Sequence, residues 1–132
     1  MALTQDRGTN FRKGDRRNDP VAAATKIYAG AIVCLDASGN AVPGSVATTL
    51  TARGVAMEQV DNSGGIAGDL TVESQTGEHR FKNDGSVSRV DIGLTAYIVD
   101  DETVADNDGT GTRSALGVIT DVDSAGVWVD IV

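Results

Sequence analysis

The sequence predicts an all-β protein, a small β-barrel or sandwich-like single domain with an extended N-terminal arm. β-Branched residues dominate, with 16 Val, 7 Ile and 13 Thr against 6 Leu, and such side chains favour strands over helices. Glycine accounts for 16 of the 132 residues and proline for only 2, which indicates many tight turns. No window of about twelve residues shows the 3.6-residue period of an amphipathic helix.

Residues 1–20 are predicted to form an arm that is disordered in the free protein. Apolar residues are sparse there, while charged residues, Gly and Asn are frequent, a composition too polar to bury a core. Five basic and three acidic residues give the arm a net charge of +2, whereas six basic and sixteen acidic residues give the rest −10. The candidate contacts with a partner are the five basic side chains and one aromatic ring: Arg7, Phe11, Arg12, Lys13, Arg16 and Arg17.

Residues 21–132 are predicted to form a β-barrel-like body, because short apolar runs alternate with turn signals throughout. Gly, Asn, Asp, Pro or Ser cluster at the expected turns, which are 37–40, 43–44, 61–65, 83–85, 106–111 and 123–126. A short helical turn is expected at 46–50. Strands are expected at 21–28, 30–36, 41–42, 53–60, 69–74, 79–81, 87–90, 93–100, 116–122 and 127–132.

The two halves of the body resemble each other. Gly30 and Gly93 each open an apolar run that ends in Asp, and the dipeptide at 54–55 is matched by the dipeptide at 117–118. Both pairs of glycines have the same separation along the chain (30 to 93, 54 to 117). Two interpretations are open: two similar β-meanders that close one barrel, or only the common way in which strands end in hairpins.

Few residues offer catalytic or metal-binding chemistry. The single histidine, His79, is expected at an exposed strand edge, and the single cysteine, Cys34, is expected to be a buried, inert thiol. The sequence contains neither a Gly-x-Ser-x-Gly elbow nor a phosphate-binding loop. The acidic loop 100–109 is the best metal candidate, but it lacks the acid spacing of an EF-hand, so a solvated turn is expected. We therefore expect no enzyme activity, no cofactor and no metal.

Short motifs in a defined order carry a resemblance to a known family. They are RKGDRR at 12–17, PVAA at 20–23, KIYAGA at 26–31, EQVDNSG at 58–64, TAYIVDD at 95–101, DGTGTR at 108–113 and GVWV at 126–129. In their order and spacing they resemble the capsid decoration, or cement, proteins of tailed bacteriophages, as found in Mu-like phages and prophages. The resemblance covers nearly the whole chain.

The resemblance implies a structural virion protein without enzymatic activity. It implies a small β-barrel-like body, bound as a homo-oligomer, often a trimer, to the major capsid protein on the outside of the expanded shell. The acidic body argues against nucleic acid and anionic membranes as partners. With neither a signal peptide nor a membrane-length apolar run, we expect assembly in the host cytoplasm and residence on the capsid exterior. The alternatives are a head–tail joining or tail structural protein and, with less support, a carbohydrate-binding module on a β scaffold.

Overall fold

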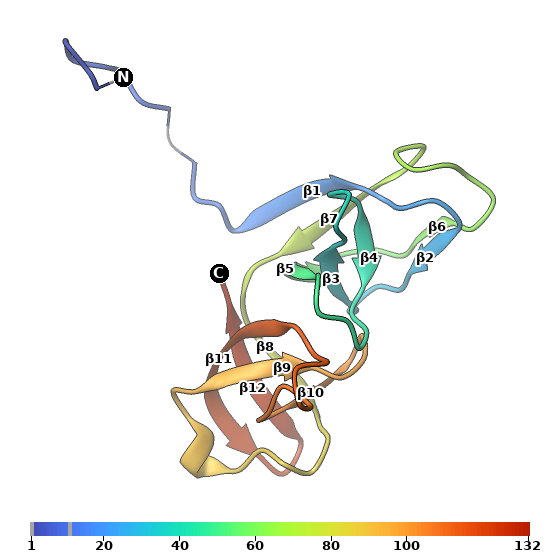
Figure 1. Ribbon diagram of the computed structural model, residues 1–132, viewed down its shortest axis with the longest axis vertical. Helices are drawn as coiled ribbons and strands as arrows, with labels where there is room; N and C mark the ends of the chain where they lie inside the picture. Colours follow the sequence, from blue (N-terminus) through green and yellow to red (C-terminus); the bar gives the residue numbers. More distant parts are fainter. Residues whose placement is uncertain (1, 11) are drawn as a thin grey trace.

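The computed structural model describes residues 2–10 and 12–132, over which the protein forms twelve β-strands, one 3-10 turn and no α-helix. The predicted all-β class is therefore confirmed. The strands form two units that follow each other along the chain and lie against each other (Figure 1). The first unit contains β1 (Arg16–Pro20), β2 (Thr25–Ile27), β3 (Ile32–Leu35), β4 (Ala41–Pro43), β5 (Thr51–Ala56), β6 (Val60–Asn62) and β7 (Thr71–Gln75). The second unit contains β8 (Gly77–Asn83), η1 (Arg89–Asp91), β9 (Thr95–Ile98), β10 (Thr103–Ala105), β11 (Ala115–Asp123) and β12 (Gly126–Ile131).

The first unit is a five-stranded sheet in the order β1-β7-β5-β3-β4. The sheet curls until its two edges meet, because Val21, which follows β1, forms a parallel bridge with Ala41 of β4. The two-stranded sheet β2-β6 joins this unit and contributes Ile27 and Val60 to its core. The remaining members of that core are Val21, Ala31, Val33, Ala41, Ala56 and Val72.

The second unit is a closed barrel of five strands in the order β10-β8-β12-β11-β9. It closes through parallel pairing of β10 with β8, while its other neighbouring strands are antiparallel. Alternating residues of β12 point into it, and Val127, Val129 and Ile131 are buried. The interior of this barrel and one face of the first unit's sheet belong to the same hydrophobic cluster.

The strands of the two units pair in the same register. Ile32 of β3 pairs with Val55 of β5, and at the equivalent place in the second unit Thr95 of β9 pairs with Val118 of β11. A β-bulge interrupts both pairings at the same place in the repeat, and β4 and β10 pair with their neighbours at the same offset. The parallel closure also recurs, as one bridge in the first unit and a two-residue ladder in the second. The sequence similarity of the halves therefore reflects two units of similar build, one a curled sheet and the other a closed barrel, and not two meanders that close a single barrel.

The repeated glycines sit where two strands approach too closely for a side chain. A Cβ atom at Gly54 would lie 2.6 Å from the carbonyl oxygen of Gln75. At the equivalent Gly117 it would lie 2.2 Å from the carbonyl oxygen of Asp130. In both cases the obstacle is the backbone of the adjacent strand, which cannot rotate away as a side chain can.

Several details differ from the sequence-based expectations. The strand expected at 87–90 is wrong, because Arg89–Asp91 form the 3-10 turn η1. The arm predicted over 1–20 is shorter, because Arg16–Pro20 form β1 and pair with β7 along its whole length. Hydrogen bonds from Thr76 to the carbonyl oxygens of Gly14 and Asp15 extend this attachment. The helical turn expected at 46–50 is wrong: the Ser114 hydroxyl donates to the carbonyl of Ala47 and accepts from the amide of Leu50, which holds the segment as an irregular loop.

Cys34 lies in β3, on the sheet face that contacts the second unit, and is completely buried. Burial raises the pKa of its thiol to about 12. Within residues 2–10 and 12–132, the protein has no helix with the length and apolar character required to cross a membrane.

The close approach at the repeated glycines generates a stability prediction. Gly54→Ala and Gly117→Ala should each lower the free energy of unfolding by about 1–3 kcal/mol, because neighbouring strands must move apart to admit the methyl group. Gly64→Ala is the matched control, since a Cβ there has no heavy atom within 4 Å, and it should change stability by less than about 0.5 kcal/mol. Urea unfolding measures all three, and equal effects at the three positions would contradict the argument.

The burial of Cys34 predicts its reactivity. At pH 8 the thiol should stay protonated in the native protein and react with an aromatic disulfide reagent only at the rate of unfolding. In urea above the unfolding midpoint it should react at the rate of an ordinary exposed thiol. Absorbance of the released thiolate measures both rates. A native rate close to the denatured rate would show that the thiol is accessible.

Candidate functional site: the basic cluster at the base of the arm

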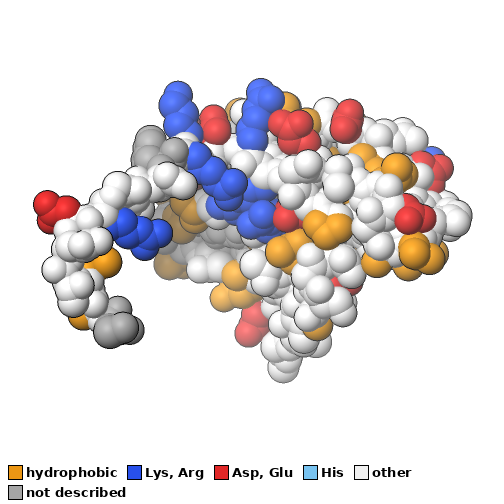
Figure 2. All heavy atoms as spheres, turned by 90° about the horizontal axis from the view of Figure 1, so that it is seen from above, with side chains coloured by type: hydrophobic (Ala, Val, Ile, Leu, Met, Phe, Trp, Pro, Cys, Tyr) orange, Lys and Arg blue, Asp and Glu red, His pale blue; other side chains and the backbone are white. Residues whose placement is uncertain are grey.

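Basic side chains gather where the arm joins the body (Figure 2). They surround a hollow of about 240 Å³ on the surface of the first unit. Its lining comes from the end of the arm, from β1, and from β5 and β7 beside it, and consists of Arg12, Arg16, Arg17, Asn18, Arg53 and Glu73. The cluster is defined here as the arginines of this lining.

The pairing of β1 with β7 sets the direction of each side chain. Arg16 and Asn18 lie on the outer face of the sheet, opposite Gln75 and Glu73. The Arg16 guanidinium lies 3.3 Å from a Glu73 carboxylate oxygen, and both side chains are about half exposed. Exposed ion pairs of this kind stabilise a protein by roughly 0–1 kcal/mol, so this pair leaves Arg16 able to exchange partners.

The neighbouring inward-facing positions of β1 are more tightly held. Asp19 is buried, and its carboxylate accepts two hydrogen bonds of 2.9 Å from the guanidinium of Arg53. Such bidentate pairing fixes both groups in orientation. Arg17 is half-buried and donates to the carbonyl oxygens of Arg53 and Val132 at 3.3 and 3.4 Å. These two arginines therefore shape the hollow, whereas Arg12 and Arg16 present charge to the solvent.

The structure brings together only part of the predicted contact set. Arg12, Arg16 and Arg17 line the hollow, while Arg7 and Lys13 lie on the arm outside it and are exposed. Phe11 lies outside the described residues. Arg12 and Lys13 form no ion pair with any residue in the described part of the chain. This leaves their charges available for an acidic partner.

Arg53 and Glu73 are the charged members of the site that sequence reasoning missed, and Asn18 is the uncharged one. The repeat contains a signal for Arg53, because the equivalent position in the second unit, directly before Gly117, is the buried Leu116. Asp19 likewise corresponds to the buried Phe81, by the register of β8 with β12. An acidic and a basic residue thus stand in the first unit where the second has two core side chains. Glu73 has no comparable signal, since it is an ordinary outward-facing strand residue.

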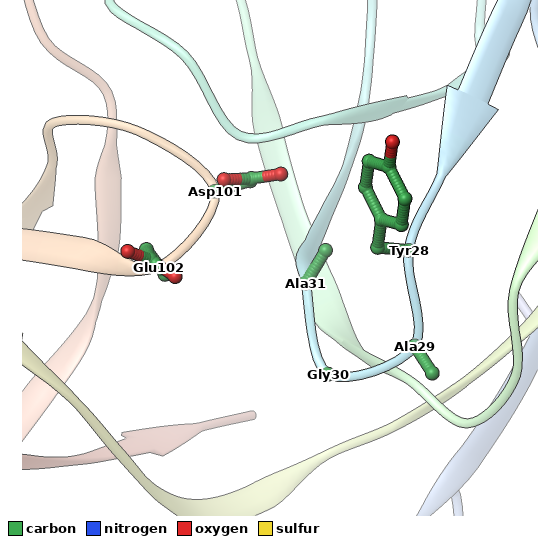
Figure 3. Close-up of a pocket in the computed structure, with 6 residues that line it drawn as sticks. All are labelled: Tyr28, Ala29, Gly30, Ala31, Asp101 and Glu102. Atoms are coloured by element: carbon green, nitrogen blue, oxygen red, sulfur yellow. The ribbon is translucent and has the colours of Figure 1, made fainter.

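A second hollow, of about 400 Å³, lies between the two units (Figure 3). Tyr28 and the segment that leads into β3 form one side, and Asp101 and Glu102 of the β9–β10 turn form the other. The Lys26 ammonium lies 4.8 Å from the centre of the Tyr28 ring. Burial, followed by repulsion from Asp100 and Glu102, raises the pKa of the Asp101 carboxyl. The lining can donate and accept hydrogen bonds, but it contains neither a nucleophilic Ser or Cys nor a His.

The other polar groups singled out in the sequence serve local structure. The His79 ring nitrogen Nε2 lies 3.2 Å from the carbonyl oxygens of both Gln75 and Thr76. In the acidic loop, Asp100 accepts a hydrogen bond from the amide of Glu102, and the side chain of Asp106 accepts one from Asn107. Across the described ranges, no three acidic, histidine or cysteine side chains come together in a way that could hold a metal ion.

The repeat predicts how the buried ion pair can be replaced. Arg53→Leu should lower the free energy of unfolding by roughly 3 kcal/mol, because it leaves the Asp19 carboxylate buried without its partner. The double variant Asp19→Phe with Arg53→Leu introduces the residues of the second unit and should recover most of that loss. Urea unfolding of the two variants and the parent measures the difference. A double variant less stable than the single one would show that the two barrel interiors are not equivalent.

Comparison with protein-family models, with curated proteins and with solved structures finds no match to this chain.

Proposed function

We propose that the protein is a capsid decoration protein of a tailed bacteriophage, which binds the outer surface of the expanded shell and stabilises it. The observation that carries the proposal is the charge separation. A cluster of arginines at the root of an extended arm stands on a body that is otherwise strongly acidic. The resemblance of the sequence motifs to decoration proteins supplies the identity of the surface.

The charge distribution favours binding through the arm. The body, with its excess of acidic residues, gains nothing by approaching an acidic shell, whereas guanidinium groups bind carboxylates in an oriented, bidentate way. In Figure 1 the arm runs away from the body instead of folding onto it, so its basic residues can reach a neighbouring surface. One exposed ion pair contributes little, but several arms in one oligomer act together through their high effective concentration.

The proposed partners of this chain are therefore the major capsid protein and further copies of itself, with which it forms a homotrimer. It places the protein on the capsid exterior after assembly in the host cytoplasm. In this role the protein acts by binding alone, without catalysis, a cofactor, nucleic acid or a membrane. Copies found at the neck or tail of labelled particles by electron microscopy would replace it with a head–tail joining or tail role.

The shortened arm dictates which truncation tests the proposal. Deleting residues 2–19 would remove most of β1, which closes the first unit, so loss of binding would be uninformative. Deleting residues 2–13 leaves β1 and its flanking bonds to Thr76 intact. The truncated chain should fold normally but lose most of its affinity for expanded, undecorated heads, measured by co-sedimentation. Unexpanded proheads should bind neither chain.

Charge variants separate the contribution of the arm's basic residues from that of its length. Arg12→Ala, Lys13→Ala and Arg16→Ala together should weaken binding about tenfold or more. Arg80→Ala, Lys82→Ala and Arg89→Ala together remove the same charge from exposed positions of the second unit and should have little effect. Phe11→Ala should weaken binding more than any single Arg→Ala. Equal loss in the two triple variants would show that only net charge matters.

A further inference from the structure

The two units have one equivalent sheet face, which is covered in the first unit (β3–β5) and exposed in the second (β9–β11). In the first unit, Ile32 and Cys34 project from β3 toward the second unit and belong to its hydrophobic cluster. On the opposite face of the sheet, Val33 of β3 and Ala56 of β5 pack into the first unit's own core. The part of the sheet that contains β3 and β5 is therefore apolar on both faces. Partly buried side chains of the neighbouring strands pack against the same cluster as Ile32: Val42, Ala52 and Val55.

One main-chain bond marks the contact between the units. The amide of Ile32 donates a 2.8 Å hydrogen bond to the carbonyl oxygen of Asp101, in the turn between β9 and β10. Figure 3 shows this turn facing the segment that leads into β3. Close beside it, a Cβ at Gly44 would lie 3.0 Å from the Ile98 side chain. The turn of one unit thus seats on the β3–β5 face of the other.

The second unit carries the same face without the same cover. By the shared register, its equivalents of Ile32, Cys34, Ala52 and Val55 are Thr95, Tyr97, Ala115 and Val118. Thr95 and Tyr97 are only half-buried, and Ala115 and Val118 are exposed, Val118 by 45%. In the described residues, no loop carbonyl accepts a hydrogen bond from the Thr95 amide. The face is also less apolar than its equivalent, with Thr and Tyr for Ile and Cys, as suits a surface exposed before association.

The first unit has a turn equivalent to the β9–β10 turn, and this turn is likewise uncovered. Asp101 corresponds to Ser38, in the turn between β3 and β4. The two turns have the same build: Asp36 donates its amide hydrogen to the carbonyl of Asn40, and Val99 donates to Thr103. Ser38 and the glycine after it are exposed at the tip. Each chain therefore has a second pair of the surfaces that form the contact between its units. They are the β9–β11 face of the second unit and the β3–β4 turn of the first, and neither is covered within the chain.

We propose that a second copy of this chain docks there, so that the β9–β11 face of one copy binds the β3–β4 turn of the next. The occupant is this chain itself, because the contact continues the one already present between its own two units. The two surfaces are different, so the contact is heterologous, and its repetition gives a ring or a filament. The inference deepens the homo-oligomer of the proposed function by naming its contact surfaces, but it does not depend on a capsid, since it concerns the free protein.

Disulfide cross-linking tests the proposed pairing directly. Two proteins are made in a Cys34→Ala background, one with Thr95→Cys and the other with Ser38→Cys. A main-chain hydrogen bond like that of Ile32 with Asp101 brings the Cα atoms within the reach of a disulfide, about 4.4–6.8 Å. Mild oxidation of the mixture at high protein concentration should give a cross-linked dimer on a non-reducing gel. Each protein oxidised alone should give little, because the two new cysteines lie on different surfaces.

The cross-linking experiment can also contradict the proposed pairing. Failure to cross-link in the mixture, or cross-linking of the Thr95→Cys protein with itself, would overturn the proposal, the second by showing an isologous contact. Val118→Lys adds a measurement that needs no cysteine: it should weaken self-association, measured by sedimentation, by about tenfold or more. Val46→Lys is the control, since Val46 is exposed by 54% in a loop of the first unit, and it should leave self-association unchanged. Equal effects of the two lysines would also overturn the proposal.

Discussion

The packing of the β3–β5 face onto the second unit is the contact on which the remaining structure depends. Each unit has only about sixty residues, a size at which a single core gives marginal stability. The β3–β5 part of the first unit's sheet adds stability because it is apolar on both faces, with Val33 in one core and Ile32 and Cys34 in the other. This shared sheet joins the two small units into one folded body, and β1, with the root of the arm, lies on the surface of that body.

The two units differ at one layer of their interiors. Where the second unit has Phe81 and Leu116, the first has Asp19 and Arg53, joined as a bidentate pair. The layer also includes Ser74, which occupies the place of Val129 and whose buried hydroxyl has no hydrogen-bond partner in the described part of the chain. A polar interior at this end lets Arg17 and Arg53 reach the surface hollow. Two of the four arginines of the basic cluster, Arg17 and Arg53, thus lie beside the polar layer that distinguishes the first unit from the second.

The fold class could be predicted, and the similarity of the halves could be noticed, because both depend on local signals. Turn residues, β-branched strands and paired glycines all act over a few positions, and the glycines at 54 and 117 mark a close approach that recurs. The end of the arm could not be predicted, since β1 is polar and is a strand only because β7, far along the chain, pairs with it. Arg53 was missed for the same reason: its partner, Asp19, is distant in the sequence. The arm residues of the candidate site were predictable from charge, but their convergence on β5 and β7 was not.

The long separation between β1 and β7 also bears on how the chain is made. A ribosome synthesises β3, β4 and β5 well before the strand that joins β1 to them, and before the whole second unit. During that interval the apolar face with Ile32 and Val55 has no cover, and the sheet edge that β7 will occupy is open. Nascent domains in this state are prone to pair with one another. The rate of translation past residue 75 therefore sets how long this surface stays exposed to neighbouring nascent chains.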